Sequence, residues 1–101
     1  MDDPCQEINP LVKLPNQAEQ EMVNTIYLGI EGMNCGNCLN RVRNSLLATY
    51  GVNTVTIDLQ QGLGEVLYNP GLASPATLIE AVAAAGTDGF HNYRAVVLSL
   101  G

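Results

Sequence analysis

The chain has 101 residues, 47% of them hydrophobic, which is enough for one small domain with a packed core. Ten acidic residues against four basic ones give a net charge of −6 at pH 7. This balance excludes a nucleic-acid binder, which needs a Lys/Arg stripe to neutralise phosphates, and it argues against docking on an anionic membrane. No apolar run approaches the roughly 20 residues that cross a bilayer, so membrane insertion by this chain is not expected.

The first 22 residues differ in composition from the rest. They hold three prolines, five acidic residues and one basic residue, so this stretch carries −4 of the total −6. Their apolar residues keep no regular period, which predicts a mobile or loosely docked acidic arm over 1–22, with a short helix over 17–22 as an alternative. The amino end lacks the basic and apolar regions of a secretory signal, so with Met1 as the native start the expected location is cytoplasmic.

The predicted domain covers residues 23–101. Its first half starts with a strand and a helix. Apolar residues alternate in the first segment and recur every four residues in the second: Ile26, Leu28 and Ile30, then Cys38, Val42 and Leu46. Gly51 is expected to end the helix. A second strand follows over 52–59, and the turn 60–64 predicts a hairpin.

The second half repeats the order. Val66 and Tyr68 predict the inward face of a third strand, and Ser74 with Pro75 forms a good helix start. The apolar stripe of this helix is expected to consist of Leu78, Ile79, Val82 and Ala83, and Gly86 should end it. The final strand is predicted over 93–100, with Val96, Leu98 and Leu100 on one face.

The predicted order is therefore strand, helix, strand, strand, helix, strand. Two strand–helix–strand halves with right-handed crossovers give a four-stranded antiparallel sheet with both helices on one face. The expected fold class is α+β, ferredoxin-like.

The chemistry is concentrated in the segment 33–38, Met-Asn-Cys-Gly-Asn-Cys. Cys35 lies in the predicted loop and Cys38 in the first helical turn, where unpaired N–H groups and the helix dipole favour thiolates. Two soft thiolates suit Cu(I), whereas Zn(II) prefers four ligands, and no second ligand pair appears. A redox dithiol is the alternative from another chemical class. Three cysteines do not suggest a disulfide framework.

The segment 32–38, Gly-Met-Asn-Cys-Gly-Asn-Cys, resembles the metal-binding loop of the heavy-metal-associated domain family. That family includes copper chaperones, mercury-binding proteins and the amino-terminal modules of metal-transporting P-type ATPases. The resemblance covers about Thr25 to Leu100, with similar residues at positions 41–42, 46–47, 51–52, 55–59, 66–70 and 81–86.

The resemblance implies a metal carrier and not an enzyme. Cys35 and Cys38 become the ligands of a surface dithiolate, most naturally for Cu(I), with Zn(II), Hg(II) or Cd(II) as alternatives. Gly32, Met33 and Phe90 are expected to support the loop, with Met33 as a buried anchor. The implied partner is a metal-transporting P-type ATPase or another metal carrier, and a metal-bridged homodimer is a further option.

Two more residues are candidates for the site. His91 is either a third ligand beside the cysteines or an ordinary hydrogen-bonded histidine. Cys5 is either an incidental thiol of the arm or an auxiliary thiol that caps the ion or bridges two copies. Arg41 and Arg43 are read as a solvated helix face, or as charges that offset the thiolates and steer an acidic partner.

Overall fold

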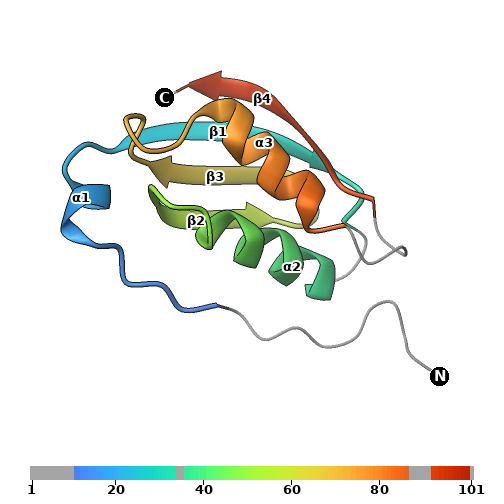
Figure 1. Ribbon diagram of the computed structural model, residues 1–101. Coiled ribbons are helices and arrows are strands. Elements are labelled where there is room, and N and C mark those ends of the chain that lie inside the picture. Colours follow the sequence, from blue (N-terminus) through green and yellow to red (C-terminus); the bar gives the residue numbers. More distant parts are fainter. Residues whose placement is uncertain (1–10, 34–35, 87–91, 101) are drawn as a thin grey trace.

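A computed structural model of the chain describes residues 11–33, 36–86 and 92–100 (Figure 1). The elements in chain order are α1 (Gln17–Gln20), β1 (Asn24–Glu31), α2 (Gly36–Leu47), β2 (Val52–Asp58), β3 (Leu63–Tyr68), α3 (Pro75–Ala84) and β4 (Arg94–Leu100). None of the helices in this described part has the length and apolar run needed to cross a membrane.

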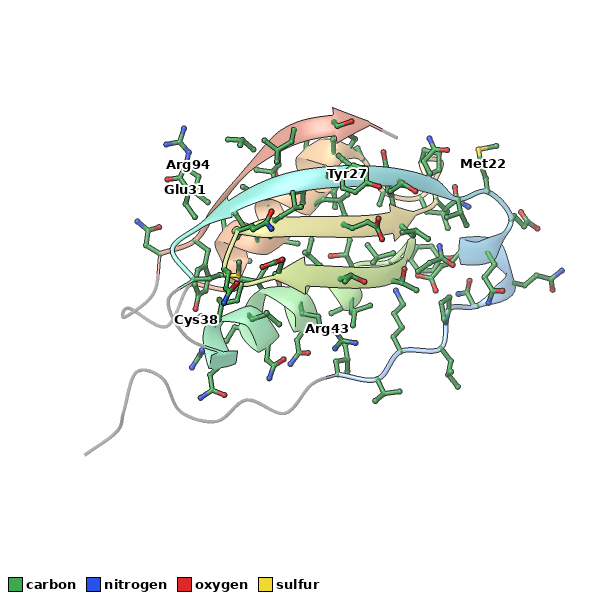
Figure 2. All side chains as sticks on the ribbon, turned by 180° about the vertical axis from the view of Figure 1, so that it is seen from behind. Met22, Tyr27, Glu31, Cys38, Arg43 and Arg94 are labelled. Atoms are coloured by element: carbon green, nitrogen blue, oxygen red, sulfur yellow. The ribbon has the colours of Figure 1, made fainter. Side chains whose placement is uncertain are left out.

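The four strands form one antiparallel sheet in the order β2-β3-β1-β4. Both α2 and α3 lie on the same face of this sheet, and the view from behind leaves the opposite face open (Figures 1 and 2). This arrangement confirms the predicted ferredoxin-like fold. It also places the start of α2 directly after the end of β1, at one end of the sheet.

The core lies between the sheet and the two long helices. Alternation along β1 buries Ile26, Leu28 and Ile30, as predicted. The i, i+4, i+8 stripe of α2 is fully enclosed against them, and its members are Cys38, Val42 and Leu46. The helix is followed by Gly51, whose φ of +100° explains why a glycine stands there.

Helix α3 begins as predicted but uses a slightly different face. The Ser74 side chain accepts a hydrogen bond from the Thr77 N–H, and Pro75 occupies the first turn. Leu78 and Val82 are buried, whereas Ala83 is exposed, so its place in the apolar stripe was predicted wrongly. An alanine carries too little apolar area to decide which side of a helix turns inward.

Strand β4 breaks the strict alternation on which its face was predicted. The pairing with β1 shifts between Tyr27 and Leu28, so that Val97 lies opposite Leu28 while Ser99 lies opposite Tyr27. The side chains of Val96 and Leu98 cover the open-face side of Gly29 and are largely solvent-exposed. Val96 and Leu98 therefore share one face, as predicted, and the side chain of Leu100 lies outside the described part of the chain.

The described part of the arm is docked on the domain, contrary to the expectation of a mobile or loosely docked segment. Residues 11–22 follow the α2–β2 side of the molecule and include the short helix α1 (Figure 1). The side chain of Glu19, which belongs to this segment, is buried. We call residues 11–22 the strap.

Candidate metal centre

Cys38 lies in the first turn of α2, at the end of the sheet where β1 finishes (Figure 2). Its side chain is 0% exposed and belongs to the hydrophobic core, and it forms no disulfide. The family resemblance had implied a thiol at the surface. The helical stripe explains the difference, because Cys38 is the first member of the apolar row that continues through Val42 and Leu46.

Gly32 sets the path of the chain out of β1. Its φ is +99°, and a Cβ atom there would collide with the backbone oxygen of Asn92. A glycine is therefore required both for the backbone conformation and for the close approach. The same contact shows that the segment just before β4 lies against the start of the loop that leads to α2.

Met33 follows Gly32 and is half-buried, with its side chain packed against the core. The next described residue is Gly36, which begins α2. Four other predicted site residues lie outside the described residues: Cys5, Cys35, Phe90 and His91. Among residues 11–33, 36–86 and 92–100, no cluster of three His, Cys, Asp or Glu side chains is found.

The charge around the start of α2 favours anionic ligands. The helix carries no acidic residue in its first turn, and its sequence contains two arginines and no carboxylate. Arg41 and Arg43 are half-buried and so differ from the freely solvated face that one prediction described. Arg43 Nη1 donates a hydrogen bond of 2.9 Å to the Leu11 carbonyl, which ties this guanidinium to the strap (Figure 2).

At the opposite end of α2, a buried carboxylate anchors the strap. Glu19 Oε2 accepts hydrogen bonds from Lys13 Nζ at 2.8 Å and from the Gly51 N–H at 2.6 Å. Glu19 Oε1 accepts from the Asn16 N–H at 3.0 Å, which completes a capping box at the start of α1. The Glu19 side chain is 3% exposed and the Lys13 side chain 17%.

Further hydrogen bonds join the strap to the domain. Asn53 Nδ2 donates to the Glu19 carbonyl and Asn69 Nδ2 to the Ala18 carbonyl, each at 2.8 Å. Lys13 Nζ donates a further bond of 3.1 Å to the carbonyl of Thr49. Since buried polar groups are costly unless they are paired, these bonds make the docked strap a specific arrangement.

Burial by itself would raise the pKa of Glu19. The hydrogen bonds from Lys13, Gly51 and Asn16, together with the positive charge of Lys13, outweigh that effect, and the pKa lies below its ordinary value of 4.5. The carboxylate is therefore charged wherever the protein works near neutral pH.

Sequence analysis missed this anchor, although one local signal was present. The pattern Asn16-x-x-Glu19 directly after Pro15 has the spacing of a capping box. The partners Gly51, Asn53 and Asn69 are 32 to 51 residues away in the chain, and no local pattern indicates them.

Curated relatives with similar sequences include copper proteins of two kinds. The chain is 34% identical over 70 residues to copper-transporting ATPase 1 of Rattus norvegicus, which covers 68% of this chain and 5% of the ATPase. It is 31% identical over 67 residues to the copper chaperone CopZ of Staphylococcus haemolyticus, which covers 66% of this chain and 97% of the chaperone. The chain thus spans a small part of the ATPase relatives and nearly all of the chaperone.

A solved structure agrees with the fold. The amino-terminal domain of a potential copper-translocating P-type ATPase from Bacillus subtilis, in its Cu(I)-loaded state, superposes with a TM-score of 0.69 and 30% identity. The superposition covers 79% of this chain and 92% of that domain. The heavy-metal-associated domain model matches residues 28–88. This match and the ferredoxin-like sheet show that the chain belongs to the heavy-metal-associated domain family, whose members are metal-binding modules and not enzymes.

Proposed function

We propose that this protein binds Cu(I) through Cys35 and Cys38 and passes the ion to a partner protein. The observation that carries the proposal is the placement of Cys38 in the first turn of α2, directly after a loop whose entry is fixed by Gly32. In the sequence, Cys35 directly precedes Gly36, the first residue of α2. The copper relatives of both kinds support the choice of ion.

Two thiolates form a low-coordinate site that suits Cu(I), and the ion remains open to a further sulfur. The start of α2 contributes the positive end of the helix dipole, with no carboxylate in the first turn to oppose the thiolates. The arrangement therefore stabilises a negatively charged Cu(I)–dithiolate centre, and no carboxylate in the first turn of α2 adds a further negative charge.

The burial of Cys38 suggests an order for ion transfer. An entering partner thiolate forms its bond to Cu(I) while the bond to Cys35 breaks, and the bond to the enclosed Cys38 is replaced last. No electron is transferred in either exchange, and the oxidation state of copper does not change. Loading requires the Cys38 sulfur to become accessible, so the core packing around it must open locally.

The partner in this proposal is a metal-transporting P-type ATPase or another copper carrier. The chain acts either as a free metallochaperone or as a metal-binding module of a longer transporter, since relatives of both kinds cover this region. A cytoplasmic location follows from that role. His91 is one residue from Asn92, which contacts Gly32, so it stays a candidate third ligand.

Hg(II), Zn(II) and Cd(II) are the alternative ions, because soft thiolates bind all three. Mass spectrometry of the protein purified from its own cell, under conditions that retain metal, identifies the ion. A Cu(I) signal of one ion per chain is expected, and a dominant signal from another metal would contradict the assignment.

Competition for Cu(I) against a colorimetric chelator tests the ligands. Cys35→Ser and Cys38→Ser should each lose the ion to a chelator concentration at which the wild type keeps it. Equal retention by all three proteins would refute the proposed site. Disulfide-reductase turnover of the metal-free protein tests the redox alternative, and we expect a negligible rate.

A further inference from the structure

The sheet has two edges, and they differ in character. Strand β2 forms one edge, where the exposed side chains are Thr54, Thr56 and Asp58 and the pairing with β3 is irregular near the start of the strand. The strap also holds this start, because Asn53 Nδ2 donates to the Glu19 carbonyl. Polar side chains, a charge and an irregularity are features by which natural sheets keep an edge from pairing further.

Strand β4 forms the other edge, and it is apolar (Figure 1). Its side chains Val96, Val97 and Leu98 are 40%, 40% and 57% exposed. The strand contains one basic residue, Arg94, and no acidic residue. Although the chain has a net charge of −6, two copies of this strand can therefore meet without opposing carboxylates.

Hydrogen bonding within the sheet shows which backbone groups of β4 face outward. The Ile30 N–H donates to the Gly62 carbonyl at 2.7 Å, on the β3 side of β1. The N–H and C=O of a residue in an antiparallel ladder point to the same side, so Ile30 makes no ladder bond to Ala95, its opposite residue in β4. The N–H and C=O of Ala95 therefore face away from β1, and so do those of Val97, two residues later and before the shift in pairing.

These outward groups fit a second copy of the same strand. When two β4 strands pair antiparallel about a two-fold axis at Val96, Ala95 of each copy lies opposite Val97 of the other, and each such pair can exchange two N–H···O=C bonds. The two Val96 side chains then face each other across the axis. Leu98 of each copy lies opposite Arg94 of the other, where it can cover the aliphatic stem of the arginine.

We propose that the β4 edge is a dimerisation surface, through which two copies of this chain join their sheets into one continuous antiparallel sheet. A second copy is the partner because the strand is complementary to itself in the direction of its backbone groups and in its apolar side chains, and because it opposes no carboxylates. We expect a seam of one strand to bury less than the about 1,200 Å² at which stable interfaces begin, so the dimer should be weak and reversible.

This dimer differs from one that a metal ion bridges. Strand β4 begins opposite the last residue of β1, at the end of the sheet that carries Cys38. Antiparallel pairing places these ends of the two copies on opposite sides of the two-fold axis, so the seam contains no metal ligand and needs no ion. The inference therefore stands apart from the proposed Cu(I) site.

Sedimentation of the metal-free full chain, with a reductant and a metal chelator present, tests the dimer from about 10 μM to about 1 mM. The average mass should rise with concentration from that of one chain toward that of two. Val96→Lys should raise the dissociation constant of the dimer at least about tenfold, because it sets two positive charges opposite each other. Thr56→Lys is the matched control, since it adds the same charge at an exposed position of the β2 edge and should dimerise like the wild type.

A mixture of two variants tests the register of the seam. Val96→Glu alone should also dimerise weakly, whereas an equimolar mixture of Val96→Lys and Val96→Glu should again form a dimer, because opposite charges then face each other across the axis. Urea unfolding checks that both variants are folded, which is expected because the Val96 side chain is 40% exposed.

Hydrogen exchange followed by NMR locates the seam on the strand. The N–H groups of Ala95 and Val97 should exchange more slowly as the protein concentration rises, because they become bonded in the dimer. The N–H of Val96, which faces β1, should show no such change.

Four results would overturn the inference. One is the mass of a single chain throughout the concentration range, which would leave the edge to a strand of another protein. The others are a dimer that Val96→Lys leaves unchanged, a folded Lys/Glu mixture that stays monomeric, and a dimer that forms only when Cu(I) is added. The proposed function fails separately, through unchanged Cu(I) retention in Cys35→Ser and Cys38→Ser.

Discussion

The two ends of α2 are held in different ways. At the amino end, the described residues are fixed by packing and by backbone geometry: Cys38 and Met33 lie against the core, and Gly32 passes close to Asn92. At the carboxyl end, directed hydrogen bonds dominate. The buried carboxylate of Glu19 alone accepts three, and amide groups of the domain hold the strap backbone.

This contrast fits the tasks that we assign to the two ends. A site that must exchange ligands benefits from an enclosure of apolar contacts, which can open without leaving buried charges unpaired. An anchor benefits from a charged group whose bonds are lost together or not at all. The molecule is thus expected to open at one end of α2 while the other end stays fixed.

The largest effect on the metal-binding end should come from Gly32→Ala. The added Cβ forces a strained positive φ and meets the Asn92 carbonyl, so we expect a loss of about 2 to 3 kcal/mol in the free energy of unfolding. Urea unfolding measures the loss. Gly29→Ala in β1 is the control, because its Cβ meets only the movable ends of Val96 and Leu98. Equal stability of the two variants would show that the loop entry is not constrained.

Glu19→Gln should have the next largest effect, at the opposite end. It leaves Lys13 without its charged partner and weakens the bond to the Gly51 N–H, so about 2 kcal/mol of stability should be lost. Glu21→Gln should change stability by less than about 0.5 kcal/mol, since that side chain is exposed. If the two variants unfold at the same urea concentration, the anchor contributes nothing to stability.

The pH dependence of stability sharpens the same comparison. Because the folded-state pKa of Glu19 lies below 4.5, its carboxylate stabilises the fold above that pH and loses this contribution as the pH falls through the folded pKa. The difference between wild type and Glu19→Gln should be constant between about pH 5 and 7 and should shrink at lower pH. If the difference in stability between the two proteins grew on acidification, the pKa of Glu19 would be raised in the folded protein and not lowered.

The smallest effect concerns access to Cys38. In the metal-free protein we expect its alkylation to be at least about tenfold slower in the folded state than in urea, because the sulfur is enclosed. Mass spectrometry of peptides containing Cys38 measures the rate. Equal rates in both states would mean that this end of α2 is already open.

Most of the fold was predictable because its signals are local. Alternation in β1, the four-residue recurrence in α2 and the Ser74–Pro75 start of α3 each correspond to an observed element. The irregular pairing of β4 was not predictable, because a register shift depends on the partner strand. Docking of the strap was missed for a similar reason, since its partners are distant in the sequence.

The candidate site was predicted less completely than the fold. The stripe that includes Cys38 already implied that its side chain turns inward, yet the family resemblance favoured a surface thiol, and the stripe described the structure better. The close approach of Gly32 to Asn92 joins two segments about 60 residues apart, and only the assembled sheet brings them together. The roles of Cys35, His91 and Phe90 stay predictions.

X-ray absorption of the Cu(I)-loaded full chain tests the central claim most directly. We predict that the ligands of Cu(I) in the wild type include two sulfurs, and that these are lost when Cys35 and Cys38 are both replaced by serine. A sulfur shell that is unchanged in the double variant would contradict the claim that these two thiolates hold the ion.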